Sequence, residues 1–211
     1  MIRLVVADDQ AILRSGLVAL LGLESDVEVV GEAADGASTL VAVAEHRPDV
    51  LLLDVQMPAG TTAEGVPGPE DGIGVAETLR GTEGAPRIIV LTTFGRAGYL
   101  RRTMEAGATG FMVKDTPVEQ LVDAIRRVHQ GLRVVDPELA AQSLAVGASP
   151  LTLKETEVLQ TAAAGGTTAR IAQTLFLSEG TVRNHISSAI GKLGVANRAE
   201  AVRAGTENGW I

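Results

Sequence analysis

The stretch "VVADDQAILRSG", residues 5–16, decides the fold. An apolar run rich in valine ends at two adjacent carboxylates, Asp8 and Asp9, and a helical pattern begins directly after them. Such a run is typical of a strand that is buried on both faces. Two like charges this close repel, so each makes the other harder to ionise. The acidic pair therefore needs an explanation beyond local structure.

The same type of run recurs along the first 129 residues. Short apolar runs occupy residues 2–8, 27–33, 49–54, 87–93 and 110–114. Helical patterns lie between them, such as Leu13, Leu17, Leu20 and Leu21 at positions i, i+4, i+7 and i+8. Five strand–helix units in series predict an α/β fold with a doubly wound, five-stranded parallel sheet.

Polar residues stand where these predicted strands end. Asp8 and Asp9 end the first strand, Asp54 the third, Thr92 the fourth and Lys114 the fifth. Ligands of such sheets bind outside the carboxyl ends of the strands. We therefore expect three carboxylates, one hydroxyl and one ammonium to project from the same edge.

These groups permit phosphoryl chemistry with a metal ion. Clustered carboxylates favour a divalent cation, and oxygen ligands without Cys or His favour Mg²⁺, Mn²⁺ or Ca²⁺. An aspartate can act as a nucleophile toward phosphorus, while a lysine and a hydroxyl stabilise the phosphoryl charge. Taken singly, each residue also has an ordinary explanation as a helix cap, loop acid, solvated charge or strand residue. Together, at successive strand ends, they predict a site.

Residues 1–129 resemble the receiver domain of two-component response regulators. The family pattern is an acidic pair, a phosphoacceptor aspartate, a threonine or serine and a lysine, and Asp8, Asp9, Asp54, Thr92 and Lys114 match it in order. The segments "DVQMP" and "EAGATGFMVKD" fit as well. The resemblance implies that Asp54 accepts a phosphoryl group from a sensor histidine kinase.

The same resemblance assigns further roles around Asp54. Mg²⁺, or Mn²⁺ in its place, would be held by Asp8, Asp9, Asp54 and the backbone carbonyl of Gln56. Lys114 would contact the phosphate. Thr92 would swing toward it and Phe111 would turn inward in step, although Phe111 also suits plain core packing. Gln56 and Phe94 occupy positions that tune dephosphorylation in the family.

The chain departs from the family pattern after Met57-Pro58. The residues "AGTTAEGVPGPE", 59–70, separate this dipeptide from Asp71-Gly72, which is about ten residues more than the pattern M-P-x-x-D-G expects. Gly, Pro and Thr without an apolar period predict a flexible loop. It is either a tolerated surface insertion or a lid, or kinase-specificity element, over Asp54.

Residues 130–149 are predicted to form a linker with a short helix that Asp136 caps and Gly147 ends. Residues 150–211 then predict four helices in a helix-turn-helix domain. Thr152 and Glu155 form a capping-box pattern at its start. Its third helix places polar side chains, including Asn184 and Ser187, opposite an apolar face that contains Val182 and Ile186. From these angles alone, a solvated helix face is as good an interpretation as a DNA-reading one.

Residues 150–211 resemble LuxR-type DNA-binding domains through "LTLKETEVL", "IAQTLFLSEGTVRNHISSAIGKLGV" and "NRAEAV". The resemblance implies that Arg183, Asn184 and Ser187 lie near base edges, and that Thr181, Lys192 and Arg198 bind phosphates. With both domains, the chain resembles a response regulator of the NarL/FixJ family, and within it actinobacterial members similar to the DesR group.

Composition sets the remaining expectations. The net charge is −8, but residues 150–211 hold six Lys and Arg against five Asp and Glu, so only this part suits a polyanion. The chain has no cysteine and no apolar stretch near the roughly 20 residues that span a bilayer. We expect a cytoplasmic protein that does not engage the membrane.

The expected function is a phosphorylation-activated transcription factor. Phosphorylation of Asp54 would favour a homodimer that binds double-stranded promoter DNA, and the first and last receiver helices are one candidate dimer surface. The chain would be no enzyme beyond its own phosphorylation and slow autodephosphorylation. Two alternatives stay open: a pseudo-receiver that partners switch without phosphate, and an aspartate-nucleophile phosphatase. The phosphatase is disfavoured because Gln56 stands where a second acid is needed.

Overall fold

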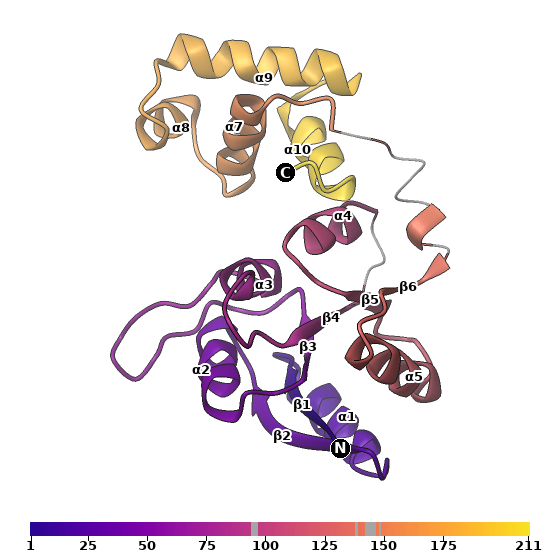
Figure 1. The fold of residues 1–211 in the computed structure, drawn as a ribbon. Coiled ribbons are helices and arrows are strands. Elements are labelled where there is room, and N and C mark those ends of the chain that lie inside the picture. The colour runs from indigo at the N-terminus through magenta and orange to yellow at the C-terminus, as the bar shows by residue number, and fades with distance from the viewer. Residues whose placement is uncertain (94–96, 138, 142–146, 148) are drawn as a thin grey trace. The chain divides into compact units, whose positions relative to one another are not determined.

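The structure is a computed structural model of residues 1–211, and it describes all of them except 94–96, 138, 142–146 and 148 (Figure 1). Phe94 therefore lies outside the described residues. The chain divides into two compact units, one of residues 1–95 and 102–139 and the other of residues 96–101 and 140–211. Among the described helices, none is both long and apolar enough to cross a membrane.

The first unit is built on a parallel sheet, as predicted. The strands are β1 (Ile2–Ala7), β2 (Val27–Ala33), β3 (Val50–Asp54), β4 (Arg87–Thr92), β5 (Gly110–Val113) and β6 (Val134–Val135). They pair in the order β2-β1-β3-β4-β5-β6, and every pair is parallel. The predicted α/β class and parallel sheet are confirmed.

The predicted strand number is wrong by one. β6 lies within residues 130–149, for which the sequence predicts a linker, and Val134 pairs with Gly110 of β5. The Val134 N–H donates to the Thr109 carbonyl at 3.0 Å, so the chain after α5 returns to the sheet edge. Two valines are too few to show a strand period, which is why the sequence pattern did not reveal this strand.

Five helices accompany the strands in the sequence, and the first residues of the fourth, up to Arg101, are assigned to the second unit. They are α1 (Ala11–Leu21), α2 (Gly36–His46), α3 (Gly72–Leu79), α4 (Ala97–Glu105) and α5 (Val118–His129). The main core joins alternate strand residues such as Leu4 and Leu52 to Leu21 of α1 and Ile125 of α5. Successive strand residues point to opposite faces, so the equally buried Leu51 belongs to the other face. The central strands are therefore covered on both sides, as their continuous apolar runs predict.

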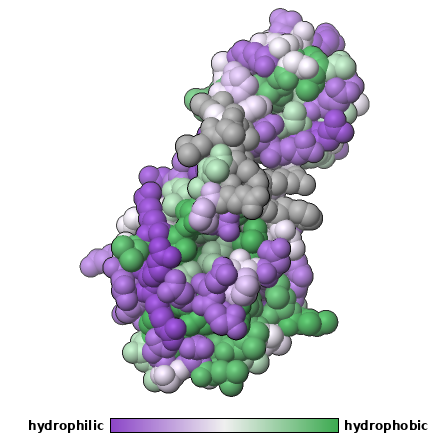
Figure 2. Space-filling view, turned by 90° about the vertical axis from the view of Figure 1, so that its right-hand side faces the viewer, coloured by the Kyte–Doolittle hydropathy of each residue, from purple (hydrophilic) through white to green (hydrophobic). Residues whose placement is uncertain are grey.

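The surface of this unit is mixed. Figure 2 shows apolar side chains, in green, gathered among polar ones, in purple, on the face that it presents. Exposed large apolar residues include three in or just after α1, namely Ile12, Leu20 and Leu23. Ile12, in the first turn of α1, is 92% exposed.

The insertion at residues 59–70 contains no helix or extended strand, as its composition predicts, but it folds back on itself as a short hairpin. Thr61 forms an antiparallel bridge with Pro67, and the Thr62 N–H donates to the Val66 carbonyl at 2.9 Å. The start of α2 donates to the base of this hairpin, with the Gly36 N–H 2.9 Å from the Pro58 carbonyl. Backbone carbonyls at the start of the insertion thus accept hydrogen bonds from N–H groups in the first turn of α2, which have no partner within the helix. The insertion is therefore anchored to the first turn of α2.

The second unit contains the four predicted helices: α7 (Leu153–Ala163), α8 (Thr168–Thr174), α9 (Glu179–Leu193) and α10 (Arg198–Glu207) (Figure 1). Its start has the predicted capping box, in which Thr152 accepts from the Glu155 N–H and Glu155 accepts from the Thr152 N–H. Ser178 caps α9, which ends at Gly194 in the left-handed region. The helix-turn-helix prediction is confirmed.

Candidate phosphoacceptor site and nucleic-acid interface

Three carboxylates meet at the carboxyl edge of the sheet. Asp8 and Asp9 follow β1 and Asp54 ends β3, and these strands are neighbours whose last paired residues are Ala7 and Leu53. Asp8, Asp9 and Asp54 each place a carboxylate oxygen so that the three lie within 4.8 Å of one another. Asp8 and Asp54 are buried, while Asp9 is exposed. The sheet topology thus brings together residues that are 45 positions apart in the sequence.

Lys114 lies between the two buried carboxylates. Its Nζ is 2.7 Å from Asp8 Oδ2 and 2.8 Å from Asp54 Oδ2. The lysine is held in place because its backbone N–H donates to the Thr92 carbonyl at the end of β4 at 2.8 Å. Burying charges is costly unless they are paired, so the ammonium offsets part of the carboxylate repulsion.

Burial and charge shift the pKa values of this group. Burial raises the pKa of the Asp54 carboxyl, and it outweighs the hydrogen bond and charge of Lys114, which act in the opposite direction. Burial acts to lower the pKa of Lys114, but the hydrogen bonds and charges of Asp54 and Asp8 prevail and raise it. A lysine with a raised pKa stays cationic at neutral pH. The site therefore has a fixed positive group beside a carboxylate that is harder to ionise than usual.

The carboxylates fit a small divalent cation. All three offer oxygen ligands within reach of one point, and Mg²⁺ or Mn²⁺ prefers such ligands. A cation there would favour the ionised form of Asp54, whose pKa burial raises. Gln56 lies beside the cluster, and its N–H donates to Asp54 Oδ1 at 3.2 Å. This donor orients the carboxylate of Asp54 and places the Gln56 backbone next to it.

Thr92 and Phe111 lie behind the cluster on adjacent strands. Thr92 ends β4 and is buried, and its carbonyl accepts the Lys114 N–H. Phe111 is fully buried in β5, where it pairs with Val90. This position suits core packing as well as the inward position expected of the family's aromatic residue.

Two further residues of the site are not predictable from the sequence pattern. The Arg14 Nη1 of α1 donates to the Asp8 carbonyl at 2.5 Å, and its Nε donates to Glu32 at 3.2 Å. Gly72 begins α3, and a Cβ added there would lie 1.9 Å from the Asp54 carbonyl oxygen. The Asp71-Gly72 dipeptide was the only sequence signal of this close contact.

The helix α9 presents the residues expected to read bases. Arg183, Asn184 and Ser187 are all exposed. The Arg183 Nη1 lies 3.3 Å from Glu179 one turn earlier, a surface ion pair that contributes little to stability. Thr181 is half-buried, with its Oγ1 2.8 Å from Ser178 Oγ at the helix cap. Thr181, Arg183 and Asn184 lie in the first half of α9, the part that a helix-turn-helix inserts into the major groove, and Ser187 follows its middle residue.

The two other predicted phosphate-binding residues make contacts inside the unit. Lys192 Nζ is 2.7 Å from Oε2 of the buried Glu155. The Arg198 Nη2 donates to the carbonyls of Ala162 and Gly166, at 3.2 and 3.0 Å, near the end of α7. Both cations thus have intramolecular partners that the sequence pattern did not predict.

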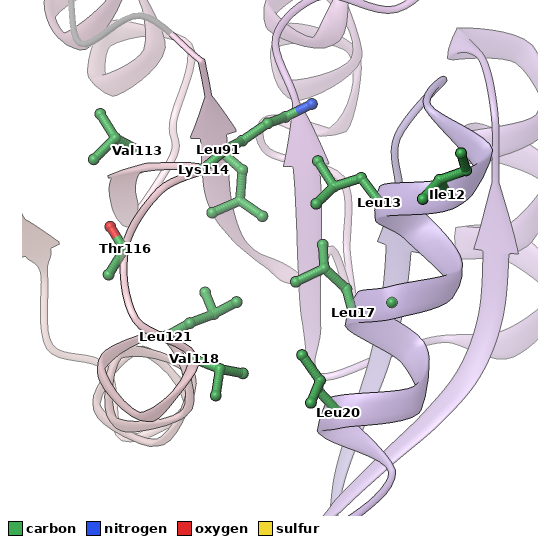
Figure 3. Close-up of a pocket in the computed structure, with 11 residues that line it drawn as sticks. Ile12, Leu13, Leu17, Leu20, Leu91, Val113, Lys114, Thr116, Val118 and Leu121 are labelled. Carbon is green, nitrogen blue, oxygen red and sulfur yellow. The ribbon is translucent and has the colours of Figure 1, made fainter.

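An apolar groove of about 340 Å³ lies beside the acidic cluster. Figure 3 shows Leu13, Leu17 and Leu20 of α1 facing Leu91 and Leu121 across it. Lys114 lines one end of the groove with its side chain, so the groove and the cluster share a residue. Ile12 adds an exposed apolar side chain to the lining.

Comparisons with known proteins identify the families that the two parts of the chain match. Residues 4–126 match the family model "Response regulator receiver domain", and residues 149–204 match "Bacterial regulatory proteins, luxR family". Transcriptional regulatory protein DesR of Bacillus subtilis (strain 168) is 43% identical over 211 residues, covering 100% of both chains. The uncharacterized transcriptional regulatory protein YvfU of the same strain has the same identity and coverage. A solved structure of two RcsB dimers bound to two parallel DNAs has a TM-score of 0.68 at 25% identity, covering 98% of each chain.

Proposed function

Because this chain belongs to the NarL/FixJ family of response regulators, which join a receiver domain to a LuxR-type DNA-binding domain, we propose that phosphorylation of Asp54 controls its activity as a transcription factor. The observation that carries the proposal is the ammonium of Lys114, held within 2.8 Å of Asp54 and of Asp8. The phosphodonor is a sensor histidine kinase, and the protein acts on promoter DNA in the cytoplasm.

The positions of the side chains support the following phosphoryl transfer. An Asp54 carboxylate oxygen attacks the phosphorus, a P–O bond forms, and the P–N bond to the donor histidine breaks as the electron pair returns to nitrogen. Lys114 lies where it neutralises charge on the transferred group, and Thr92 lies one strand away as a hydroxyl donor. The raised pKa of Lys114 keeps its ammonium charged throughout.

Asp8, Asp9 and Asp54, with the Gln56 backbone carbonyl, would hold Mg²⁺ or Mn²⁺ at this site. When bound, the cation supplies positive charge to the phosphoryl oxygens. The buried Asp8 and the exposed Asp9 have separate tasks: Asp8 also pairs with Lys114, while Asp9 opens the cluster to solvent. The Arg14 hydrogen bond to the Asp8 carbonyl orients this pair.

The phosphoryl group adds about −1.5 to −2 of charge beside Lys114. This change biases the receiver between two states through Thr92, Lys114 and Phe111, and it favours a homodimer. The groove beside α1 is the candidate dimer surface, because it is lined by apolar side chains and contains the exposed Ile12. A relative of the same architecture, RcsB, is described as a dimer on DNA. Two copies would place two α9 helices on neighbouring major-groove faces about 34 Å apart.

The proposed chemistry is limited to the protein itself. Asp54 accepts its own phosphoryl group and loses it slowly to water, and no other substrate is turned over. A phosphatase would need a second acid where Gln56 stands, and Gln56 carries an amide. The pseudo-receiver alternative predicts that the protein functions without phosphate on Asp54.

Treatment with acetyl phosphate and Mg²⁺, followed by intact mass measurement, tests the proposal. The wild type is expected to gain one phosphoryl group and Asp54→Ala none. Asp123→Ala removes an exposed carboxylate on α5 and serves as the matched control, with labelling equal to wild type. Equal labelling of Asp54→Ala rejects the site, while no labelling of any variant favours the pseudo-receiver.

A further inference from the structure

We propose that Glu155 is a positioning residue that fixes the DNA-reading helix α9, and that Lys192 serves this contact instead of a DNA phosphate. The inference rests on the proposed function, because it assumes that α9 reads DNA. It deepens that function by separating the residues that contact DNA from those that orient the helix.

The Glu155 carboxylate is almost fully buried, and both of its oxygens accept hydrogen bonds. It is 4% exposed in the first turn of α7. Its Oε1 accepts from the Ser188 hydroxyl at 2.7 Å, and its Oε2 accepts from Lys192 Nζ at 2.7 Å and from the Thr152 N–H at 2.7 Å. One carboxylate thus caps α7 and holds the second half of α9.

The two partners on α9 are placed for this task. Ser188 and Lys192 are four residues apart, so they lie one turn apart on the same face of the helix. At 3.6 residues per turn, Lys192 lies about 180° around the axis from Arg183. Arg183 and Lys192 therefore lie on opposite flanks of the polar face of α9, and the Lys192 ammonium is engaged by Glu155 of α7. The geometry therefore assigns Lys192 to the interior contact.

The cost of burying a charge also favours the contact between Lys192 and Glu155. A buried carboxylate is costly unless it is paired and hydrogen-bonded, and removing one partner leaves it uncompensated. If Lys192 moved to a DNA phosphate, Glu155 would lose its only cationic partner among the described residues. Arg183, by contrast, forms a surface pair with Glu179, which DNA can replace at little cost.

The salt dependence of DNA binding separates the two roles of Lys192. Each phosphate that a protein neutralises contributes about −0.9 to the slope of log K against log salt. The probe is a duplex that the phosphorylated wild type selects from a random-sequence pool, and the full chain is titrated over a range of KCl concentrations. For Lys192→Met we expect affinity about tenfold lower, an unchanged slope and a melting temperature lowered by several degrees. A slope smaller in magnitude by about 0.9 with unchanged melting overturns the proposal.

A second variant keeps the test informative if Lys192→Met folds poorly. Ser188→Ala removes one hydrogen bond to Glu155 without changing any charge, and it is expected to weaken DNA binding with an unchanged slope. Wild-type affinity for Ser188→Ala argues against the proposal.

A double variant gives a further test. The variant with both Glu155→Gln and Lys192→Met is expected to bind DNA no more weakly than the weaker-binding single variant, because both changes break the same contact. If the losses of DNA-binding free energy in the two single variants add up in the double variant, the proposal is overturned.

The variant Arg183→Ala distinguishes a failure of the proposed DNA-reading role of α9 from a failure of the inference about Lys192 and Glu155. It is expected to reduce affinity for the selected duplex because Arg183 is assigned to base edges. If Arg183→Ala binds like wild type, the assigned reading face is wrong and the proposed function of α9 fails with it. If Arg183→Ala binds weakly while Lys192→Met loses slope, only the inference about Lys192 and Glu155 fails.

Discussion

Gly72 shows how strongly a single residue constrains the phosphoacceptor site. A Cβ at this position would lie 1.9 Å from the Asp54 carbonyl oxygen, which is backbone and cannot rotate away. Gly72→Ala is therefore expected to displace Asp54, to abolish labelling by acetyl phosphate, and to lower the free energy of unfolding by about 1–3 kcal/mol or more. Intact mass and denaturant unfolding measure the two effects.

The matched control for this prediction is another glycine. An added Cβ at Gly16 in α1 meets nothing within 4 Å. Gly16→Ala should be labelled like wild type and should unfold with a free energy higher by up to about 1 kcal/mol, since alanine favours a helix interior. Normal labelling of Gly72→Ala would mean that the close approach to Asp54 is not required.

Single residues differ in how far the sequence predicts them. The convergence of Asp8, Asp9, Asp54 and Lys114 could be predicted, because parallel strands place their carboxyl ends at one edge. The contact of Arg14 with the Asp8 carbonyl could not, because it depends on how α1 is rotated on the sheet. Likewise, nothing in a lysine's sequence position distinguishes a DNA phosphate from Glu155 as its partner. Such choices are made by packing between elements.

At the level of elements, long periodic segments were predictable and short or irregular ones were not. The five apolar runs have enough residues to show their type, whereas β6 has two. The insertion after Pro58 lacks an apolar period, yet its backbone forms a hairpin that binds the start of α2. Backbone hydrogen bonds carry no side-chain signature, so composition alone described this segment as a loop.

The contact between α7 and α9 makes the helical unit sensitive to acid. Burial acts to raise the pKa of Glu155, but hydrogen bonds from Lys192, Thr152 and Ser188 prevail and lower it to about 2. A carboxyl with a lowered folded-state pKa stabilises the unit above its unfolded pKa of 4.5, and this stabilisation is lost as pH falls from 4.5 toward 2. We expect a loss of about 1–3 kcal/mol over this range.

The measurement uses Trp210, the only tryptophan in the chain, whose fluorescence reports on the helical unit within the full-length protein. Denaturant unfolding is followed at several pH values between 2 and 7 for wild type and Glu155→Gln. The variant is expected to be less stable at neutral pH and to lose less stability on acidification. A parallel pH dependence in both proteins would show that other carboxyls dominate.

At the scale of the whole molecule, the two units have charge balances that suit separate tasks. Residues 1–149 hold 12 Lys and Arg against 21 Asp and Glu, a net charge of −9, while residues 150–211 hold six against five, a net charge of +1. A long-range attraction to DNA is therefore weak for one copy, and two copies on one duplex double the number of contacts. A dimer is the simplest way for phosphorylation in one unit to control DNA binding by the other.

Ile12→Glu tests this coupling. Ile12 is 92% exposed, so the substitution should leave the fold and the labelling of Asp54 intact. It places a charge in the groove lining, where a partner copy would have to desolvate it. With acetyl phosphate and Mg²⁺, sedimentation velocity should show dimers for wild type and monomers for Ile12→Glu. The variant should bind a duplex with two half-sites at least tenfold more weakly. Val41→Glu on α2, which alters another exposed apolar residue, should behave like wild type. If phosphorylated Ile12→Glu dimerises normally, the dimer forms through a different surface.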